Sequence, residues 1–279
     1  MTPLRISIVT PCLNDARYIE ECLHSIHVQG YPNLEHIVID GGSTDGSVEI
    51  IRRYADRLAY WISEPDAGHA DALHKGLARA TGDVVTWVCS NDLLLSGALE
   101  NVAGFFAAHP DCEWAVGNGL LIDETSRVTE RVWAVPFTVR SIQLWQLWGT
   151  CQPATFMRRR ALERVGGIDR TLNVCVDTDL FLRLAKLEVP LRIPHFLAAL
   201  RIHSDSQSQR HAARVRETDE RIKSASGRPV WPAQLMKLAY RFYHWRYRGV
   251  QVLNETLRRH KAYTLGASVW SSPTEQGSH

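Results

Sequence analysis

The stretch Asp83-Val84-Val85-Thr86-Trp87-Val88-Cys89-Ser90-Asn91-Asp92 decides the fold. Its apolar, largely β-branched run follows a Thr81-Gly82 turn, which is typical of a buried central strand in a parallel sheet. Ligands of open α/β sheets bind just outside the carboxyl ends of the strands. Asp92 is therefore a candidate for metal or substrate contact. The alternative is that Asn91 and Asp92 only cap the next helix.

Three earlier apolar runs, at residues 6–10, 35–40 and 59–63, also end in polar loops. Helical spacing of apolar residues predicts a helix after each of them. Strands that alternate with helices imply right-handed crossovers and a mostly parallel sheet. The polar, glycine-bearing loops then share one edge, as a nucleotide cleft requires.

The pattern changes after His109-Pro110. Short strands are predicted at 113–116, 120–123, 128–135, 154–157 and 191–202, with helical segments around 139–147, 159–165 and 179–187. We interpret this half as the acceptor-side walls. The predicted organisation is therefore a domain at 1–210, divided into a nucleotide-binding half (1–110) and an acceptor-side half (111–210), a helical extension at 211–265 and a loose tail at 266–279.

Charge is unevenly distributed along the 279 residues, although the net charge is only +2. Residues 201–263 hold 14 of the 32 lysines and arginines but 5 of the 30 acidic residues. Such a segment suits an anionic partner, either a phosphate group or an acidic membrane surface, or it is simply a solvated basic face. Aromatic and basic side chains alternate in residues 231–262, which fits core packing or peripheral membrane contact.

The six cysteines show no CxxC pair and no regular spacing, which argues against zinc and disulfide scaffolds. The apolar run at 6–9 is too short for a signal peptide, and no run is long enough to span a membrane. We expect a cytoplasmic protein with free thiols, in one alternative peripheral at the inner face of the membrane, and no nucleic-acid partner.

A P-loop is excluded because GxxxxGK[ST] does not occur. An ordered series of other motifs runs from about residue 5 to 210: Ile8-Val9-Thr10-Pro11 with Asn14, Ile39-Asp40-Gly41-Gly42-Ser43-Thr44-Asp45-Gly46-Ser47, Glu64-Pro65-Asp66-Ala67-Gly68 with Asp71-Ala72 and Lys75-Gly76, Ser90-Asn91-Asp92, Gln152-Pro153-Ala154-Thr155, Gly166-Gly167-Ile168-Asp169, Asp177-Thr178-Asp179-Leu180 and Arg201-Ile202-His203. In this series the sequence resembles the family 2 glycosyltransferases. That resemblance implies a GT-A fold, Rossmann-like with flanking helices, and a nucleotide-diphosphate sugar as donor.

The resemblance also implies a nucleotide-sugar site, in which Asp40 would accept a hydrogen bond from a uracil ring. A carboxylate beside a base edge recognises N–H donors. Its alternative role is to cap the turn before Gly41. Lys75 would lie near phosphate, or on a solvated helix position. The full set implied for the donor is Thr10, Pro11, Asn14, Asp40, Gly68, Asp71, Lys75, Ser90 and Asn91.

By the same resemblance, Asp92 and His203 would hold a divalent cation, Mn²⁺ or Mg²⁺, since hard cations take oxygen ligands shared with phosphates. The family often has aspartate where this chain has Asn91, so a weak or phosphate-dependent site is expected. Asp177 would be the catalytic base of an inverting displacement, and Asp179 would support the loop.

The predicted function is transfer of a sugar from a nucleotide-diphosphate donor, a UDP-sugar in our reading, to an acceptor hydroxyl with inversion. The acceptor would be a glycan, a glycolipid or a small molecule in surface glycan or related biosynthesis. The alternative is a catalytically weak or inactive protein that binds nucleotide sugars.

Overall fold

The structure is a computed structural model that describes residues 3–134, 137–139, 151–172, 174–203, 206 and 212–227. The chain divides into two compact units, Met1–Pro229 and Val230–His279, of which the second lies outside the described residues. The helical segment predicted at 139–147 also lies outside them beyond residue 139, as do the aromatic and basic stripe at 231–262 and the tail at 266–279. The domain boundary at residue 210 stays a prediction.

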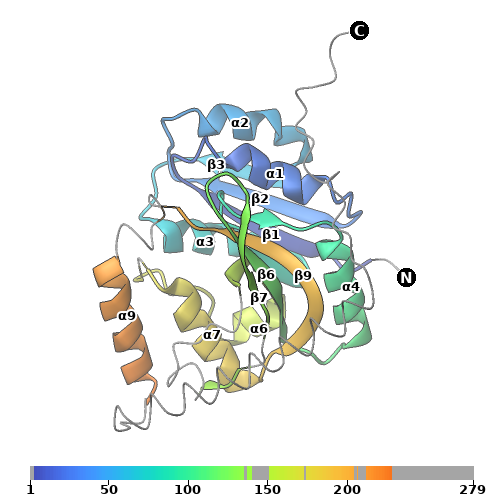
Figure 1. Ribbon diagram of the computed structural model, residues 1–279, viewed down its shortest axis with the longest axis vertical. Helices are drawn as coiled ribbons and strands as arrows, with labels where there is room; N and C mark the ends of the chain where they lie inside the picture. The colour runs from blue at the N-terminus through green and yellow to red at the C-terminus, as the bar shows by residue number, and fades with distance from the viewer. Residues whose placement is uncertain are drawn as a thin grey trace. The chain divides into compact units, whose positions relative to one another are not determined.

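The first half of the chain builds the parallel part of one sheet. Its strands are β1 (Ile6–Cys12), β2 (Leu34–Asp40), β3 (Tyr60–Ser63) and β4 (Val84–Trp87), and they lie in the order β3-β2-β1-β4. Figure 1 shows β3, β2 and β1 side by side. Ile6 of β1 pairs with Leu34 on one side and with Val84 on the other, all in parallel. The four predicted strands and their direction are confirmed, so the carboxyl ends of all four lie at one edge.

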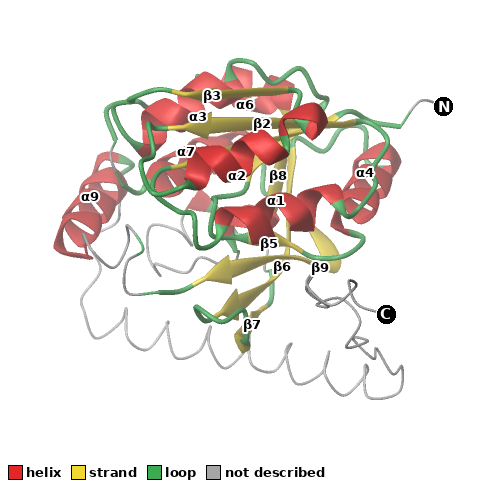
Figure 2. Ribbon diagram, turned by 90° about the horizontal axis from the view of Figure 1, so that it is seen from above, coloured by secondary structure: helices red, strands yellow, loops and turns green. Residues whose placement is uncertain are grey.

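Helices cover both faces of this sheet (Figure 2), and the strands are therefore buried on both sides. One face packs Val9, Ile39 and Trp87 against α3 (His69–Leu77) and α7 (Val176–Leu187). The other face packs Ile8 and Val84 against α1 (Ile19–His27) and α4 (Ala98–Ala108). Helix α2 (Ser47–Arg53) joins α1 over Val38 of β2 and is followed by the short 3₁₀ turn η1 (Ala55–Arg57).

The second half extends the same sheet with mixed strand directions, and the α/β fold class with flanking helices is confirmed. The sheet order is β3-β2-β1-β4-β8-β6-β9-β5, with β7 paired to β6. Strands β6 and β9 are parallel, whereas β8 is antiparallel to β4 and β6, and β5 to β9. The remaining elements are β5 (Leu93–Leu94), β6 (Trp114–Ile122), β7 (Val128–Val132), η2 (Gln152–Ala154), β8 (Thr155–Arg158), α6 (Arg159–Arg164), β9 (Leu191–Arg201) and α9 (Ala212–Ala225).

Strand β6 replaces the two short strands that were expected at 113–116 and 120–123. Gly117 and Gly119 lie in the middle of it, in the interval that separated the two expected strands. A β-carbon on Gly117 would lie 2.3 Å from Leu197 Cδ1, and one on Gly119 would lie 2.2 Å from Cys151 Cβ. These glycines therefore allow close packing rather than a turn. No helix of the described residues is long and apolar enough to cross a membrane.

Glu35 holds the amino-terminal end of the parallel strands together. Its buried carboxylate accepts hydrogen bonds from Ser7 Oγ (2.5 Å), the Thr81 amide (2.7 Å) and Thr81 Oγ1 (2.8 Å), and pairs with Arg5 at 2.7 Å. Burial alone would raise the pKa of Glu35, but the hydrogen bonds from Ser7 and Thr81 outweigh it and lower the pKa. This carboxylate joins β1, β2 and the turn before β4.

We predict that Glu35→Ala lowers the free energy of unfolding by about 2–4 kcal/mol at pH 7, because it leaves buried donors unpaired. Since the native pKa is lowered, the stabilisation is present above the ordinary pKa of glutamate and is lost as the pH falls through the native value. Urea unfolding at pH 7 and at acid pH measures it. Glu20→Ala is the matched control, since it breaks the exposed pair with Arg53 and should cost less than about 1 kcal/mol. Equal losses in the two variants would contradict the prediction.

Candidate active site

Asn14 joins the loop after β1 to the loop after β2. It adopts a left-handed conformation with φ 51°, which suits asparagine better than most residues. Its amide donates to Ser43 Oγ at 2.7 Å, and its side-chain Oδ1 accepts from the Thr44 amide at 2.9 Å. The two loops are therefore held in one arrangement by one residue.

Asp15 extends this connection to the loop after β4. Its Oδ2 accepts a hydrogen bond of 2.6 Å from Ser90 Oγ, and its amide donates to Ser47 Oγ at 2.9 Å. Burial raises the pKa of Asp15, and the hydrogen bond from Ser90 opposes the rise. The sequence did not indicate Asp15 as a site residue, because nothing in a linear pattern places it against Ser90.

Asp40 is fully buried at the carboxyl end of β2 and caps the turn that follows. Its Oδ2 accepts from the Gly42 amide (3.1 Å), the Ser43 amide (2.9 Å) and Ser63 Oγ (2.7 Å), while Oδ1 accepts from Ser43 Oγ (2.5 Å). This is the turn-cap geometry. A contact between Asp40 and a base ring therefore requires one of these bonds to be exchanged.

Asp66 lies over the same turn, and the sequence did not single it out as a site residue. A β-carbon on Gly41 would lie 2.9 Å from Asp66 Oδ2, so a larger residue at position 41 would displace the Asp66 carboxylate. Burial raises the pKa of Asp66, although its Oδ1 accepts a hydrogen bond of 2.8 Å from the Gly68 amide. A second carboxylate thus stands at the end of β2.

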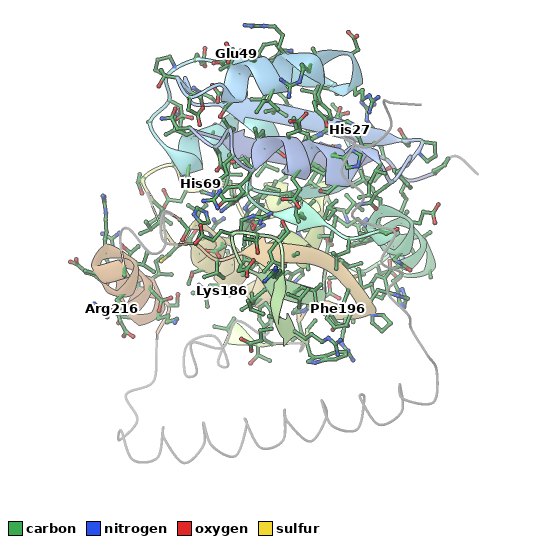
Figure 3. The ribbon with its side chains drawn as sticks, turned by 45° about the horizontal axis from the view of Figure 1, so that its top comes forward. His27, Glu49, His69, Lys186, Phe196 and Arg216 are labelled. Carbon is green, nitrogen blue, oxygen red and sulfur yellow. The ribbon has the colours of Figure 1, made fainter. Side chains whose placement is uncertain are left out.

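Thr10 and Pro11 support the site from the interior. Thr10 Oγ1 lies 3.0 Å from His36 Nε2, and His36 Nδ1 lies 3.0 Å from Nε2 of His27. Figure 3 labels His27 on α1. Burial lowers the pKa of His27 to about 4 and that of His36 well below its usual value, so both rings are neutral at pH 7. The Thr10 hydroxyl is thus directed toward His36 and α1, and the place of Thr10 in the nucleotide pocket stays a prediction. The Pro11 carbonyl accepts from the Ser90 amide at 3.3 Å.

Asp71, in the first turn of α3, binds two positively charged side chains. The helix begins directly after Gly68, whose φ is 110°. Asp71 Oδ1 accepts a 2.6 Å hydrogen bond from Arg170, and its Oδ2 lies 3.2 Å from Lys75 Nζ. Burial would raise the pKa of Asp71, but bonds from the Ala67 amide, Lys75 and Arg170 outweigh it and lower the pKa. Lys75 also pairs with Glu64 at 3.0 Å, so its charge is already shared. Arg170 follows the Gly-Gly-Ile-Asp motif, and that position was its only sequence signal.

Asn91 and His203 meet across the end of the sheet. Asn91 Nδ2 lies 2.9 Å from His203 Nε2, although 112 positions separate the two residues. The ring of Tyr18 packs against that of His203 with centroids 5.1 Å apart. The predicted convergence of the loop after β4 with the residues after β9 is thus present, but through Asn91.

Asp92 is 1% exposed, and its Oδ1 accepts a hydrogen bond of 2.9 Å from the Arg201 amide. Burial raises the pKa of Asp92 to about 7. Among the described residues no group of three His, Cys, Asp or Glu side chains could hold a metal ion. The side-chain amide of Asn91 and the imidazole of His203, which lie next to each other, do not suit a hard cation, because such a cation prefers several oxygen ligands. The expected set of Asp92 and His203 therefore does not fit a cation held by the protein alone.

Asp177 lies in the first turn of α7, after Cys175, whose φ is 58°. Its Oδ1 accepts from the Thr178 amide at 2.9 Å, and the side chain stays partly exposed. Burial raises the pKa of Asp177, and the carboxylate of Asp219 on α9 raises it further. The charge of Asp177 also contributes to the raised pKa of Cys89, after burial and other neighbours.

Asp179, in contrast, has a structural position. Its Oδ2 accepts two hydrogen bonds from Arg183, of 2.9 Å and 2.5 Å. Arg183 in turn donates to the carbonyls of Val165 and Gly167. Asp179 thus fixes the loop before α7, as expected from the sequence, and leaves Asp177 as the carboxylate with free acceptor capacity.

We predict that Asp92→Asn is more stable than the wild type at pH 8, on the order of 1–4 kcal/mol, because it removes a buried charge and keeps the acceptor for the Arg201 amide. The native pKa is raised, so the native state retains its proton where the unfolded state has lost it. Wild-type stability therefore falls as the pH rises from 3.8 to about 7. Thermal unfolding at pH 5 and pH 8 tests this. An equal loss of stability at both pH values would mean that the ionised carboxylate is required.

Comparisons with known proteins agree with this architecture. The family model described as Glycosyl transferase family 2 matches residues 7–166. An uncharacterized glycosyltransferase of Mycobacterium tuberculosis is 31% identical over 196 residues, which are 67% of this chain and 71% of that protein. A PGL/p-HBAD biosynthesis glycosyltransferase of the same organism is 28% identical over 181 residues, covering 63% of this chain and 68% of that protein.

Solved structures show the same fold at low sequence identity. Staphylococcus aureus TarS 1-349 in complex with UDP-GlcNAc matches with a TM-score of 0.62 and 19% identity, over 80% of this chain and 66% of that one. The chain spans only 37% of another TarS structure. The mannosyltransferase PcManGT from Pyrobaculum calidifontis, in complex with GDP-Man and Mn²⁺, matches with a TM-score of 0.55 and 18% identity, over 95% of this chain and 89% of that one. On the family match and the relative at 31% identity, this chain belongs to glycosyl transferase family 2.

Proposed function

We propose that this protein transfers a sugar from a nucleoside diphosphate donor to an acceptor hydroxyl. The observation that carries the proposal is the joining of the loops after β1, β2 and β4 at one sheet edge, through Asn14 and Asp15. Ligands of α/β sheets bind at this edge, and a site fixed before binding loses less entropy when the ligand arrives. Family membership supports the same reaction class.

We propose a UDP-sugar as the donor. TarS was solved with UDP and with UDP-GlcNAc, whereas the mannosyltransferase was solved with GDP-Man. The Asp66 carboxylate, which lies against Gly41 at the end of β2, can accept the N–H donor of a uracil ring, and Asp40 can do so once it exchanges one of its present hydrogen bonds. The Mn²⁺ of the mannosyltransferase complex supports a divalent cation that enters together with the donor, since the described residues do not hold one alone.

Asp177 is the proposed general base. It removes the proton from the acceptor hydroxyl while that oxygen attacks the anomeric carbon. The bond from this carbon to the diphosphate oxygen breaks on the opposite face, with inversion, and both bonding electrons leave with the nucleoside diphosphate. A raised pKa brings the carboxylate closer to the operating pH, where a general base is more effective. The acceptor class, a glycan, glycolipid or small molecule, and the cytoplasmic location stay predictions.

A second candidate function is binding of a nucleotide sugar without turnover. The burial of Asp92, and the absence of a three-ligand metal group from the described part of the chain, favour this alternative. The two functions differ in one measurable respect, since both require nucleotide binding but only the transferase releases nucleoside diphosphate from a donor.

The test is calorimetric binding of UDP, GDP and dTDP, with and without Mn²⁺, combined with a UDP-release assay on UDP-sugars. We predict that UDP binds and that Asp177→Asn keeps this binding but lowers turnover by about 10²–10⁴-fold. Asp56→Asn, which changes an exposed carboxylate in η1, should alter neither quantity. Binding of UDP without release from any UDP-sugar would favour the second function. No binding of any nucleotide would contradict both.

The carboxylate of Asp219 should contribute to the pH dependence of turnover, because it adds to the effect of burial on the pKa of Asp177. Asp177 must be deprotonated to act as base, so kcat/KM falls as the pH drops below its raised pKa. Neutralising Asp219 lowers that pKa and should move the acid limb to lower pH. Lys223, paired with Asp219 at 2.5 Å, shifts the limb in the same direction once its partner is neutral. The pH profile of Asp219→Asn tests this, with Asp219→Glu as the charge-keeping control. Identical acid limbs in all three proteins would contradict it.

A further inference from the structure

The guanidinium of Arg201, at the end of β9, is completely buried and connects three segments of the chain. Nε donates to the Asn91 carbonyl at 2.9 Å. Nη1 donates to the Asp123 carbonyl and to Ser126 Oγ, both at 3.0 Å, and Nη2 donates to Glu21 Oε2 at 2.6 Å. The guanidinium of Arg201 is therefore bonded to the loop after β4, to the β6–β7 turn and to helix α1.

The backbone of Arg201 also bonds to the loop after β4. Its amide donates to Asp92 Oδ1, so side chain and backbone bind two successive residues of that loop. Ile202 is tied to β6 by its amide, which donates to the Ile122 carbonyl at 2.9 Å. His203, the next residue, is thereby placed within 2.9 Å of Asn91 Nδ2. Arg201 thus controls both members of the pair formed by Asn91 and His203.

Tyr18 completes the arrangement from α1. The guanidinium carbon of Arg201 lies 4.6 Å from the centre of the Tyr18 ring, and the His203 ring lies 5.1 Å from it. The Tyr18 hydroxyl is buried, and among the described residues no side chain or backbone group bonds to it. The ring therefore serves as a packing surface between the cation and the imidazole.

We propose that Arg201, with Glu21 as its counter-ion, is a positioning residue that holds Asn91 and His203 at the donor diphosphate. The inference rests on the proposed function, because that function places this pair at the donor. A buried ion pair adds little net stability compared with apolar packing, so its contribution lies in specifying geometry. Only arginine offers a planar fork able to reach four acceptors in three directions, so lysine cannot replace it.

Arg158 is the matched control, because it is a second buried arginine that bonds backbone carbonyls. Nη2 donates to the Phe106 carbonyl at 2.7 Å, Nε donates to the Cys112 carbonyl at 3.4 Å, and the guanidinium carbon lies 5.0 Å from the centre of the Phe106 ring. It lies at the end of β8, where Arg158 pairs with Val84 at the amino end of β4. If Arg201→Lys weakens UDP binding only by destabilising the fold, Arg158→Lys should weaken UDP binding to the same degree.

The experiment compares Arg201→Lys and Glu21→Gln with Arg158→Lys by urea unfolding, UDP calorimetry and ¹⁵N NMR of the histidine rings. The His203 signals are assigned with His203→Gln. We expect both lysine variants to lose stability, but only Arg201→Lys to weaken UDP binding, by about tenfold to a hundredfold, as misplaced groups do. It should also shift the His203 ring nitrogens. Glu21→Gln should also weaken UDP binding and shift the His203 ring nitrogens, both to a smaller degree. If Arg201→Lys does not fold, Glu21→Gln is the variant that tests the proposal.

Folded Arg201→Lys, or Glu21→Gln in its place, with wild-type UDP affinity and unchanged His203 signals would overturn the proposal. Equal weakening of UDP binding in Arg158→Lys would overturn it as well, because the effect would then be general. A wild type that binds no nucleotide would instead refute the proposed function. In that case the NMR comparison still decides whether Arg201 positions His203.

Discussion

Four neighbouring parallel strands must end at the same edge of their sheet, and this constraint determines where chemistry can occur in this protein. The register of β1 with β2 and β4 brings the loops at residues 13–18, 41–46 and 88–92 together. Glu35 fixes the opposite end of the same strands, so the loops cannot slide relative to one another. Small polar residues then join the loops. The site is therefore a consequence of strand register, and its side chains are held by one another before any ligand arrives.

Two kinds of carboxylate occupy this edge, and burial separates them. Asp40 and Asp92 are almost fully buried and bond to backbone amides, as groups that maintain loops do. Asp177 keeps free acceptor capacity at a partly exposed position, although burial raises its pKa. A carboxylate that must exchange protons with a substrate needs such exposure, whereas a loop cap does not. The proposed division of roles between these carboxylates therefore rests on solvent access rather than on residue type.

Local patterns in the sequence were sufficient for the parallel half of the fold and for the order of its loops. Apolar runs and glycine-bearing turns report neighbours a few residues apart, and the four strands up to Trp87 depend on little else. The long strand β6 was expected as two short strands, and Gly117 and Gly119, which lie between those two, allow close packing against Leu197 and Cys151. Asp15, Arg170 and Arg201 were missed as site residues, since their partners lie 75 to 110 positions away in the chain. The sequence located Asp92 but not its burial, which depends on β9.

The central claim is that a nucleoside diphosphate binds at the joined loops after β1, β2 and β4. The most direct test is a crystal structure of the protein grown with UDP and Mn²⁺. The account predicts the uracil ring beside Asp40 and Asp66 and the diphosphate beside Asn91 and His203, with the bond between Asp15 and Ser90 intact. UDP bound away from these loops, or bound only after that bond has broken, would contradict it.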